Sequence, residues 1–87
     1  MTTQAVTQRI HRVVAHVFGV PLNSISDDSN PDTIPMWDSL SHINLILALE
    51  AEFGVSLTPE DTMDMVSVRL IRIILSERGV VEVPQDA

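Results

Sequence analysis

Residues 37–54 read WDSLSHINLILALEAEFG, a run with a polar start, a leucine-rich middle and a final glycine. Asp38 is a favourable N-cap residue, and Gly54 suits the left-handed conformation in which many helices end. The run therefore predicts a helix from Ser39 to Phe53. At its start the Ser39 hydroxyl stands beside a carboxylate, where free backbone N–H groups and the helix dipole favour a phosphate group.

The predicted helix carries more apolar residues than one face can hold. One stripe at helical spacing is expected to face the core and consists of Leu45, Ile46, Leu49 and Phe53. A second stripe, offset around the helix, consists of Leu40, Ile43 and Leu47. We expect the second stripe to be covered by something else, with ordinary core packing an equal alternative for Ile43.

The chain before this run predicts one helix and one long loop. Residues 7–18 show apolar residues at helical spacing, and Gly19 and Pro21 end the pattern. The residues expected to attach the loop to the core are Val20, Leu22 and Ile25. A loop as long as residues 19–37 is uncommon in a compact domain and usually has a role. Here the expected role is to deliver Ser39 to one end of the molecule.

The chain after this run predicts a short helix and a longer one. Thr58 is a capping residue and Pro59 suits the first helical position, so a short helix is expected to begin here and end near Asp64. A last helix is expected after Ser67 and extends to Arg78. Its inward residues are expected to be Val68, Ile71, Ile74 and Leu75. The predicted fold class is all-α, a small four-helix bundle with three long helices, one short helix and a long first loop.

Length and composition bound the class of protein. The 87 residues predict one domain, residues 1–87, with a core of residues 3–78 and a flexible tail of residues 79–87. Cysteine is absent, which excludes disulfides and thiolate metal sites, so thioester chemistry would need a thiol from a cofactor. The sequence shows neither a signal peptide nor an apolar run of membrane-spanning length. We therefore expect a monomeric, cytoplasmic protein.

The charge of the chain is negative and unevenly placed. The net charge is −7, lysine is absent, and residues 13–68 contain nine acidic residues but no arginine. This distribution argues against nucleic acid as a partner, because nucleic-acid binding needs cations against phosphate. It favours proteins that present basic patches, with a merely solvated acidic surface as an equal alternative.

Several of these motifs occur together in one known family. Asp38-Ser39-Leu40 follows a long loop, the leucine-rich helix ends in Glu-Phe-Gly, and a Thr-Pro-Glu-Asp helix start comes after it. Over roughly residues 3–78 the sequence resembles the acyl carrier proteins, and it fits a free-standing carrier better than a piece of a synthase. The resemblance implies that Ser39 carries 4′-phosphopantetheine, taken from coenzyme A by a phosphopantetheinyl transferase. It also implies that Asp38 helps this transferase to hold Mg2+.

The resemblance implies a carrier without catalytic activity of its own. Acyl groups would be carried as thioesters between enzymes of a fatty-acid, polyketide or other specialised pathway. The implied partners are a loading ligase for acyl or aminoacyl groups and downstream synthase or transferase enzymes. The positions that match the partner surface and the mouth of the acyl pocket are Leu40, Ile43, Asn44, Leu47, Glu50, Glu60, Asp61, Asp64 and Met65. Many carriers have acids where this helix has Ser41, Asn44 and Ala51, which indicates a dedicated pathway.

The sequence also suggests four other interpretations. An aminoacyl or peptidyl carrier, loaded by an adenylating ligase, would use the same mechanism. A helical interaction module without cofactor would use Ser39 only as a cap residue and the second stripe as a partner groove. A catalytic serine would need a base, and only His42 is near, at a position expected to be solvated. A calcium loop from Asp28 lacks glycine at its sixth position and glutamate at its twelfth, so no metal site is expected.

Overall fold

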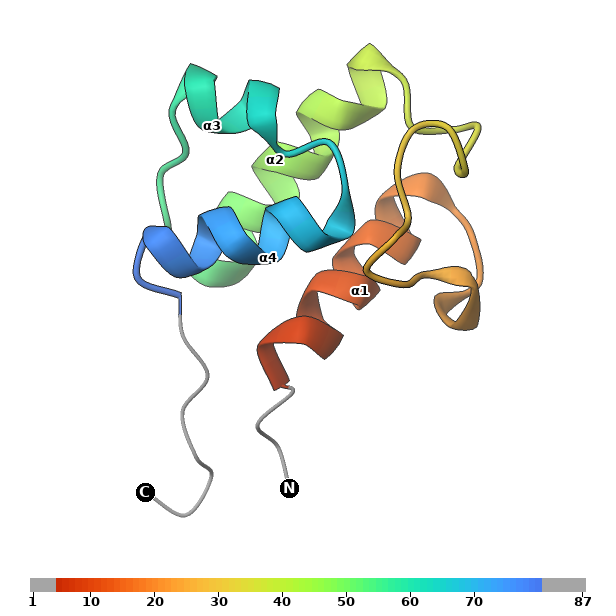
Figure 1. The fold of residues 1–87 in the computed structure, drawn as a ribbon, viewed down its shortest axis with the longest axis horizontal. Helices are drawn as coiled ribbons and strands as arrows, with labels where there is room; N and C mark the ends of the chain where they lie inside the picture. Colours follow the sequence, from red (N-terminus) through yellow and green to blue (C-terminus); the bar gives the residue numbers. More distant parts are fainter. Residues whose placement is uncertain (1–4, 81–87) are drawn as a thin grey trace.

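The computed structural model describes residues 5–80 and shows a helical protein whose elements follow the predicted order (Figure 1). The elements are α1 (Ala5–Phe18), the short 3-10 helix η1 (Leu22–Ser24), α2 (Ser39–Phe53), α3 (Pro59–Asp64) and α4 (Val68–Glu77). The predicted all-α bundle with one short helix is therefore confirmed. The last helix ends one residue earlier than expected, because Arg78 is its C-cap residue. Most of the expected tail, residues 81–87, lies outside the described residues.

The core is formed where α1, α2 and α4 pack together, with loop residues closing it. Its buried apolar residues are Val6, Ile10, Val14, Ala15, Phe18, Ile25, Ile34, Trp37, Leu45, Ile46, Leu49, Met65, Val68, Ile71, Ile74 and Leu75. The predicted inward stripe of α4 is confirmed in full. In α2 only Phe53 differs, because it is half-buried at the edge, with the Arg9 guanidinium 4.5 Å from its ring centroid.

Two of the three residues expected to attach the long loop between α1 and α2 to the core do so. Ile25 is buried and Val20 is half-buried, as expected. Leu22 remains half exposed in η1, so the expectation for Leu22 was wrong. Ile34 and Trp37, which are both buried, hold the second half of the loop. The loop therefore ends against the core directly before α2 begins.

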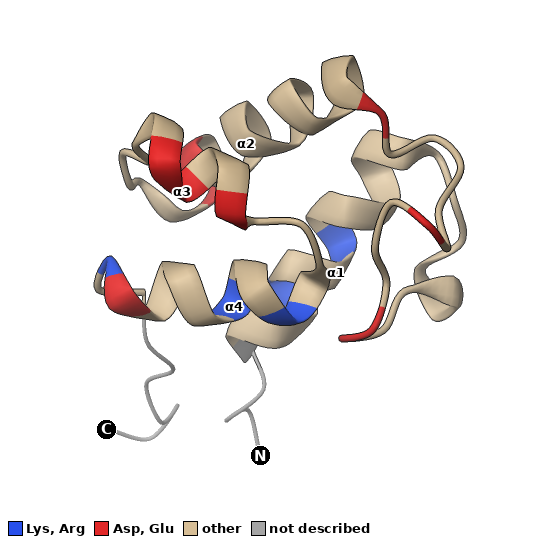
Figure 2. Cartoon of the chain, turned by 45° about the horizontal axis from the view of Figure 1, so that its top comes forward, with Lys and Arg blue, Asp and Glu red and all other residues tan. Residues whose placement is uncertain are grey.

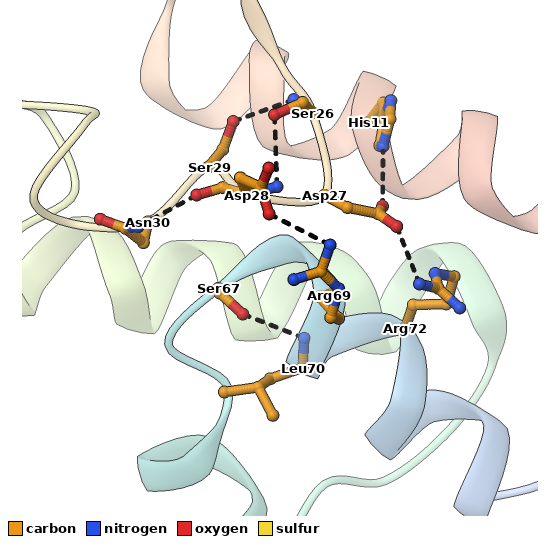
Figure 3. A network of polar contacts seen from close by, with 10 residues as sticks. All are labelled: His11, Ser26, Asp27, Asp28, Ser29, Asn30, Ser67, Arg69, Leu70 and Arg72. Atoms are coloured by element: carbon orange, nitrogen blue, oxygen red, sulfur yellow. Dashed lines mark hydrogen bonds and ion pairs between the residues drawn. The ribbon is translucent and has the colours of Figure 1, made fainter.

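Hydrogen bonds also fasten this loop to α4, and a longer contact between Asp27 and His11 links it to α1 (Figure 3). The carbonyl groups of Asp27 and Ser29 accept hydrogen bonds from the backbone N–H groups of Arg69 and Val68, both at 3.0 Å. These two N–H groups belong to the first turn of α4, where no carbonyl group within the helix can reach them. The Asp27 carboxylate accepts from Arg72 at 2.8 Å and lies 3.7 Å from the imidazole of His11 on α1. Three segments distant in sequence are joined at this point.

Capping residues mark the end of α2 and the start of α3. Gly54 ends α2 with a φ of 66°, the left-handed conformation that its sequence position predicted. Glu50 then accepts a hydrogen bond from the Leu57 N–H at 2.8 Å, which fixes the connection to α3. Thr58 and Asp61 form a capping box at the start of α3, each side chain accepting from the backbone N–H of the other. None of the helices within residues 5–80 is long and apolar enough to cross a membrane.

Candidate functional site

Ser39 is the first residue of α2, and its side chain is exposed. Asp38 caps the helix, because its carboxylate accepts a hydrogen bond from the Ser41 N–H at 2.9 Å. This hydrogen bond from the Ser41 backbone, together with that from its hydroxyl, lowers the pKa of Asp38 below the usual carboxyl value. The predicted cap is confirmed. An exposed hydroxyl therefore stands at the positive end of a 15-residue helix, beside a carboxylate that stays ionised at neutral pH.

Trp37 and His42 are the two aromatic residues nearest Ser39, and they hold the start of α2 against the rest of the protein. Trp37 is buried, and its ring centroid lies 5.0 Å from that of Phe18 on α1. Its indole Nε1–H donates to Nδ1 of His42 at 2.9 Å. With Nδ1 accepting, the proton of neutral His42 is on Nε2, which donates to the Thr62 carbonyl in α3 at 2.7 Å. The expectation of a solvated His42 was wrong.

His42 is therefore a bridge between α2 and α3 rather than a base for Ser39. Both of its ring nitrogens are engaged, one by Trp37 and the other by Thr62. A general base needs a nitrogen free to accept the proton of the attacking hydroxyl. The sequence could not indicate this bridge, because Thr62 lies 20 residues further along the chain.

We expect His42→Ala to destabilise the protein, although the substitution leaves residue Ser39 in place. The substitution leaves the Trp37 indole N–H and the Thr62 carbonyl without their partner, and an unmet buried polar group costs about 1–3 kcal/mol. Each kcal/mol lowers the melting temperature of a domain of this size by about 4–8 °C. Thermal unfolding followed by Trp37 fluorescence measures the change. His16→Ala is the matched control, since His16 is exposed on α1, and an equal loss in both variants would contradict the bridging role.

A surface depression adjoins the Ser39 hydroxyl. It has a volume of about 420 Å³ and is lined by Pro31, Trp37, Asp38, Ser39, His42 and Val66. Its walls combine an aromatic ring and aliphatic groups with the polar start of α2. An exposed serine at a helix N-terminus, with room beside it for a flexible chain, fits a phosphate-linked group attached at Ser39. Val66 was not among the residues that the sequence singled out.

Two residues expected on the partner surface are buried instead. Asp61 is 6% exposed, and Arg78 binds its two carboxylate oxygens at 2.6 and 2.8 Å. These bonds from Arg78, helped by the Thr58 N–H, hold the pKa of Asp61 well below its usual range. Met65 is fully buried in the core, where the chain turns inward after α3. The surface assignments of Asp61 and Met65 were therefore wrong.

The other expected residues remain accessible, and only Glu50 is half-buried among them. Leu40, Ile43 and Leu47 are 70%, 53% and 58% exposed, so the second stripe of α2, including Ile43, is outside the core. The exposed polar members are Asn44, Glu60 and Asp64. Glu50 is half-buried, and its carboxylate accepts from Leu57 N–H, so its main contact is internal.

Sequence reasoning missed Met63, which is 75% exposed on α3. A usable signal existed, because Met63 lies at helical spacing from Glu60 and adjoins Asp64. Figure 2 shows acidic residues on α3 and none along α2 between Asp38 and Glu50. We call a set of exposed residues on these two helices the α2–α3 surface, which consists of Leu40, Ile43, Asn44, Leu47, Glu60, Met63 and Asp64. It combines exposed aliphatic residues of α2 with exposed acids of α3, and the hydrogen bond between His42 and Thr62 joins these two helices.

Comparison with known families agrees with this geometry. Residues 8–72 match the family described as "Phosphopantetheine attachment site". The match covers more than half of the chain and includes Asp38, Ser39 and the whole of α2. The chain therefore belongs to the phosphopantetheine attachment site family, and it is a carrier domain for covalently bound 4′-phosphopantetheine.

Proposed function

We propose that the protein is an acyl carrier protein in which Ser39 is the attachment residue. The observation that carries this proposal is the position of Ser39, exposed at the first turn of α2 in a chain of the attachment family. A phosphodiester formed at Ser39 Oγ would lie at the positive end of the helix dipole, which favours its charge. The chain has no cysteine, so the attached group would supply the thiol on which an acyl thioester is formed.

The residues around Ser39 have separate roles in this proposal. Asp38 fixes the start of the helix through Ser41, and its exposed, ionised carboxylate would help the transferase to hold Mg2+. Trp37 and His42 hold the adjoining wall in place and leave the Ser39 hydroxyl accessible. The depression beside Ser39 offers the attached group an apolar surface on which to rest between reactions.

The direct test is the transfer of the cofactor in vitro. The protein is incubated with coenzyme A, Mg2+ and a phosphopantetheinyl transferase, and its intact mass is measured. We expect the gain of one phosphopantetheinyl group, located at Ser39 by peptide mapping. Two results would contradict the proposal: no gain with a transferase that modifies a known carrier in parallel, or a gain at another serine.

The nature of the cargo is the finer part of the proposal. We infer an acyl group from a fatty-acid, polyketide or other specialised pathway, because Leu40, Ile43 and Leu47 present aliphatic surface near the attachment end. Entry of a long chain between α2 and α3 would have to displace Met65 from the core. The alternative cargo is an amino acid or peptide, loaded by an adenylating ligase. The exposed aliphatic residues of α2 favour this alternative less. The mass of the group attached to protein purified from its native cell would identify the cargo.

The proposed partners meet the carrier at the α2–α3 surface. Its acids, Glu60 and Asp64, carry no ion pair with any residue from 5 to 80. An enzyme with a basic patch near its active site would be attracted by these charges and would cover the aliphatic residues of α2. The transferase, the loading ligase and the downstream enzymes would use this surface in turn.

Reversal of both acids, Glu60→Lys with Asp64→Lys, is expected to slow association with the transferase about tenfold at low salt, because steering by exposed charge raises on-rates by about 10–1000-fold. The difference should shrink as ionic strength rises, since charges are screened within about 8–10 Å at 0.1–0.15 M salt. Stopped-flow association across a salt series measures both effects. The matched control is Asp32→Lys with Glu77→Lys, which makes the same change of net charge elsewhere on the exposed surface. Equal slowing in the two variants would show that α3 has no special part in docking.

A further inference from the structure

A groove lies between α1 and α2, away from the attachment end. Its volume is about 400 Å³, and it is lined by Arg9, Arg12, Val13, His16, Val17, Ala48 and Glu52. Val13, Val17 and Ala48 are half-buried and form an aliphatic floor. Along α2, Ala48 lies nine residues from Ser39, which corresponds to about 13 Å of helix and the opposite side of its circumference. The groove is therefore separate from the proposed attachment site.

The charges at the rim of the groove differ from those of the rest of the protein. Arg9 is held in place, because it donates to the Glu52 carboxylate and the Glu52 carbonyl, each at 2.8 Å, and stacks over Phe53. Arg12 has no such partner. Residues 5–80 include every arginine of the chain, and Arg12 is the one that forms no ion pair within them. Arg12 and His16 are both exposed, so Arg12 gives a protein of net charge −7 an unpaired positive charge at this edge, and His16 adds a ring N–H that can donate to a carboxylate.

We propose that this groove is a docking surface for an amphipathic helix of a partner protein that carries two acidic residues one turn apart. Arg12 and His16 are four residues apart on α1, the spacing at which side chains on one helix face are neighbours. Two acids at the same spacing on the partner would meet them together. A stripe of small aliphatic residues beside the acids would pack on Val13, Val17 and Ala48, as helices that bind in grooves do.

The observations favour this occupant over a second copy of the chain. Within residues 5–80, the acids that a copy could present from one helix at this spacing are Glu60 and Asp64 of α3, a helix of only six residues. Two chains of net charge −7 also repel each other. Docking of α3 into the groove of a neighbour would be head-to-tail and would lead to rings or open chains of copies. A separate acidic helix meets none of these obstacles.

Such a surface would let the carrier bind two proteins at once. The α2–α3 surface is acidic and meets basic enzymes, whereas this groove is basic and selects acidic helices, so the two classes of partner do not compete. Ala48 lies about 100° around α2 from Leu47, so the floor of the groove and the aliphatic stripe of α2 face different directions, and the two surfaces adjoin at Asn44, one turn before Ala48. A scaffold could hold the carrier by the groove and leave Ser39 accessible. The inference about the groove does not depend on which residue carries the cofactor.

The test uses two synthetic helical peptides that differ only in charge. One carries two Glu residues one turn apart beside an Ala/Leu stripe, and the other has Lys at both positions. Binding to isotope-labelled full-length protein is followed by amide chemical shifts. We expect the Glu peptide to bind more tightly, with shifts centred on Val13, Val17 and Ala48. Arg12→Glu should weaken its binding at least tenfold, reverse the preference toward the Lys peptide, and leave the unfolding curve unchanged.

The matched control is Arg69→Glu, because Arg69 is an exposed arginine on α4 that has no part in the groove. Arg69→Glu changes the net charge by the same amount as Arg12→Glu, so at the same low salt concentration it should leave binding of the Glu peptide unchanged within about twofold. The proposal is overturned if neither peptide binds, if the Lys peptide binds as well as the Glu peptide, or if the shifts fall on the α2–α3 surface. Self-association that Arg12→Glu abolishes would overturn the choice of occupant.

Discussion

We expect the Ser39→Ala variant to gain no mass when it is incubated with coenzyme A, Mg2+ and a transferase that fully modifies the unaltered protein. This is the largest effect we expect, because the substitution removes the one oxygen to which the cofactor would be joined. The fold should be retained, since Ser39 is exposed and alanine has the highest helix propensity. Intact mass spectrometry measures the modification, and thermal unfolding confirms the fold.

Ser41→Ala is the matched control for this experiment. Ser41 lies in the same turn of α2, and its backbone N–H can still donate to Asp38 after the substitution. It should be modified at a normal rate. Ser24 and Ser26 are exposed in the preceding loop, and modification at either of them in the Ser39→Ala variant would show that the attachment residue is misassigned.

The second large effect is expected from Asp61→Asn, which should lower the melting temperature by several degrees. Asn keeps an acceptor for the Thr58 N–H but loses the charge to which the Arg78 guanidinium donates two hydrogen bonds. The ion pair joins α3 to the end of α4, so the loss should loosen the short helix first. Asp64→Asn is the matched control, because Asp64 is exposed on the same helix and the change of charge is identical.

The pH dependence of this effect follows from the lowered pKa of Asp61. A carboxyl group whose pKa is lower in the folded than in the unfolded state adds stability above its ordinary value of 3.8, and this addition is lost as the pH falls through the folded value. The gap between unaltered protein and Asp61→Asn should therefore be constant from pH 5 to 8, at about its full size, and should shrink below about pH 4. Urea unfolding across this range measures the gap. A gap that closed between pH 6 and 8 would assign it to another group.

Local signals in the sequence predicted most of the fold. Asp38, Gly54 and the Thr58-Pro59 start each act within one turn of their own helix, and the structure places all of them at helix ends as expected. The inward residues of α4 also followed from periodicity alone, because a solvated helix must turn one stripe toward the core. The exposed position of Ser39 at the start of α2 was predicted for the same reason, since the cap and the serine are adjacent in sequence.

The errors share a different cause, which is a partner distant in sequence. Asp61 looked like a surface acid because Arg78, its counter-ion, lies 17 residues away. His42 looked solvated because neither Thr62 nor the orientation of Trp37 can be read from helical spacing. Met65 follows directly after a short helix whose last residues, Met63 and Asp64, are exposed, and no periodicity extends over so few residues. Polar contacts between elements therefore limited the prediction of the site more than they limited the prediction of the fold.

The attachment of the long loop to α4 has a consequence for the dynamics of the carrier. Val68 and Arg69 donate their backbone protons to carbonyl groups about forty positions earlier in the chain, not to their own helix. Exchange of these two amide protons with solvent therefore requires the loop to lift off, without any need for α4 to unwind. Their exchange rates, compared with those of the amides in the next turn of α4, would report how often the loop that leads to Ser39 detaches from α4. A partner enzyme that binds one conformation of this loop would change the exchange rates of the Val68 and Arg69 amides without contacting α4.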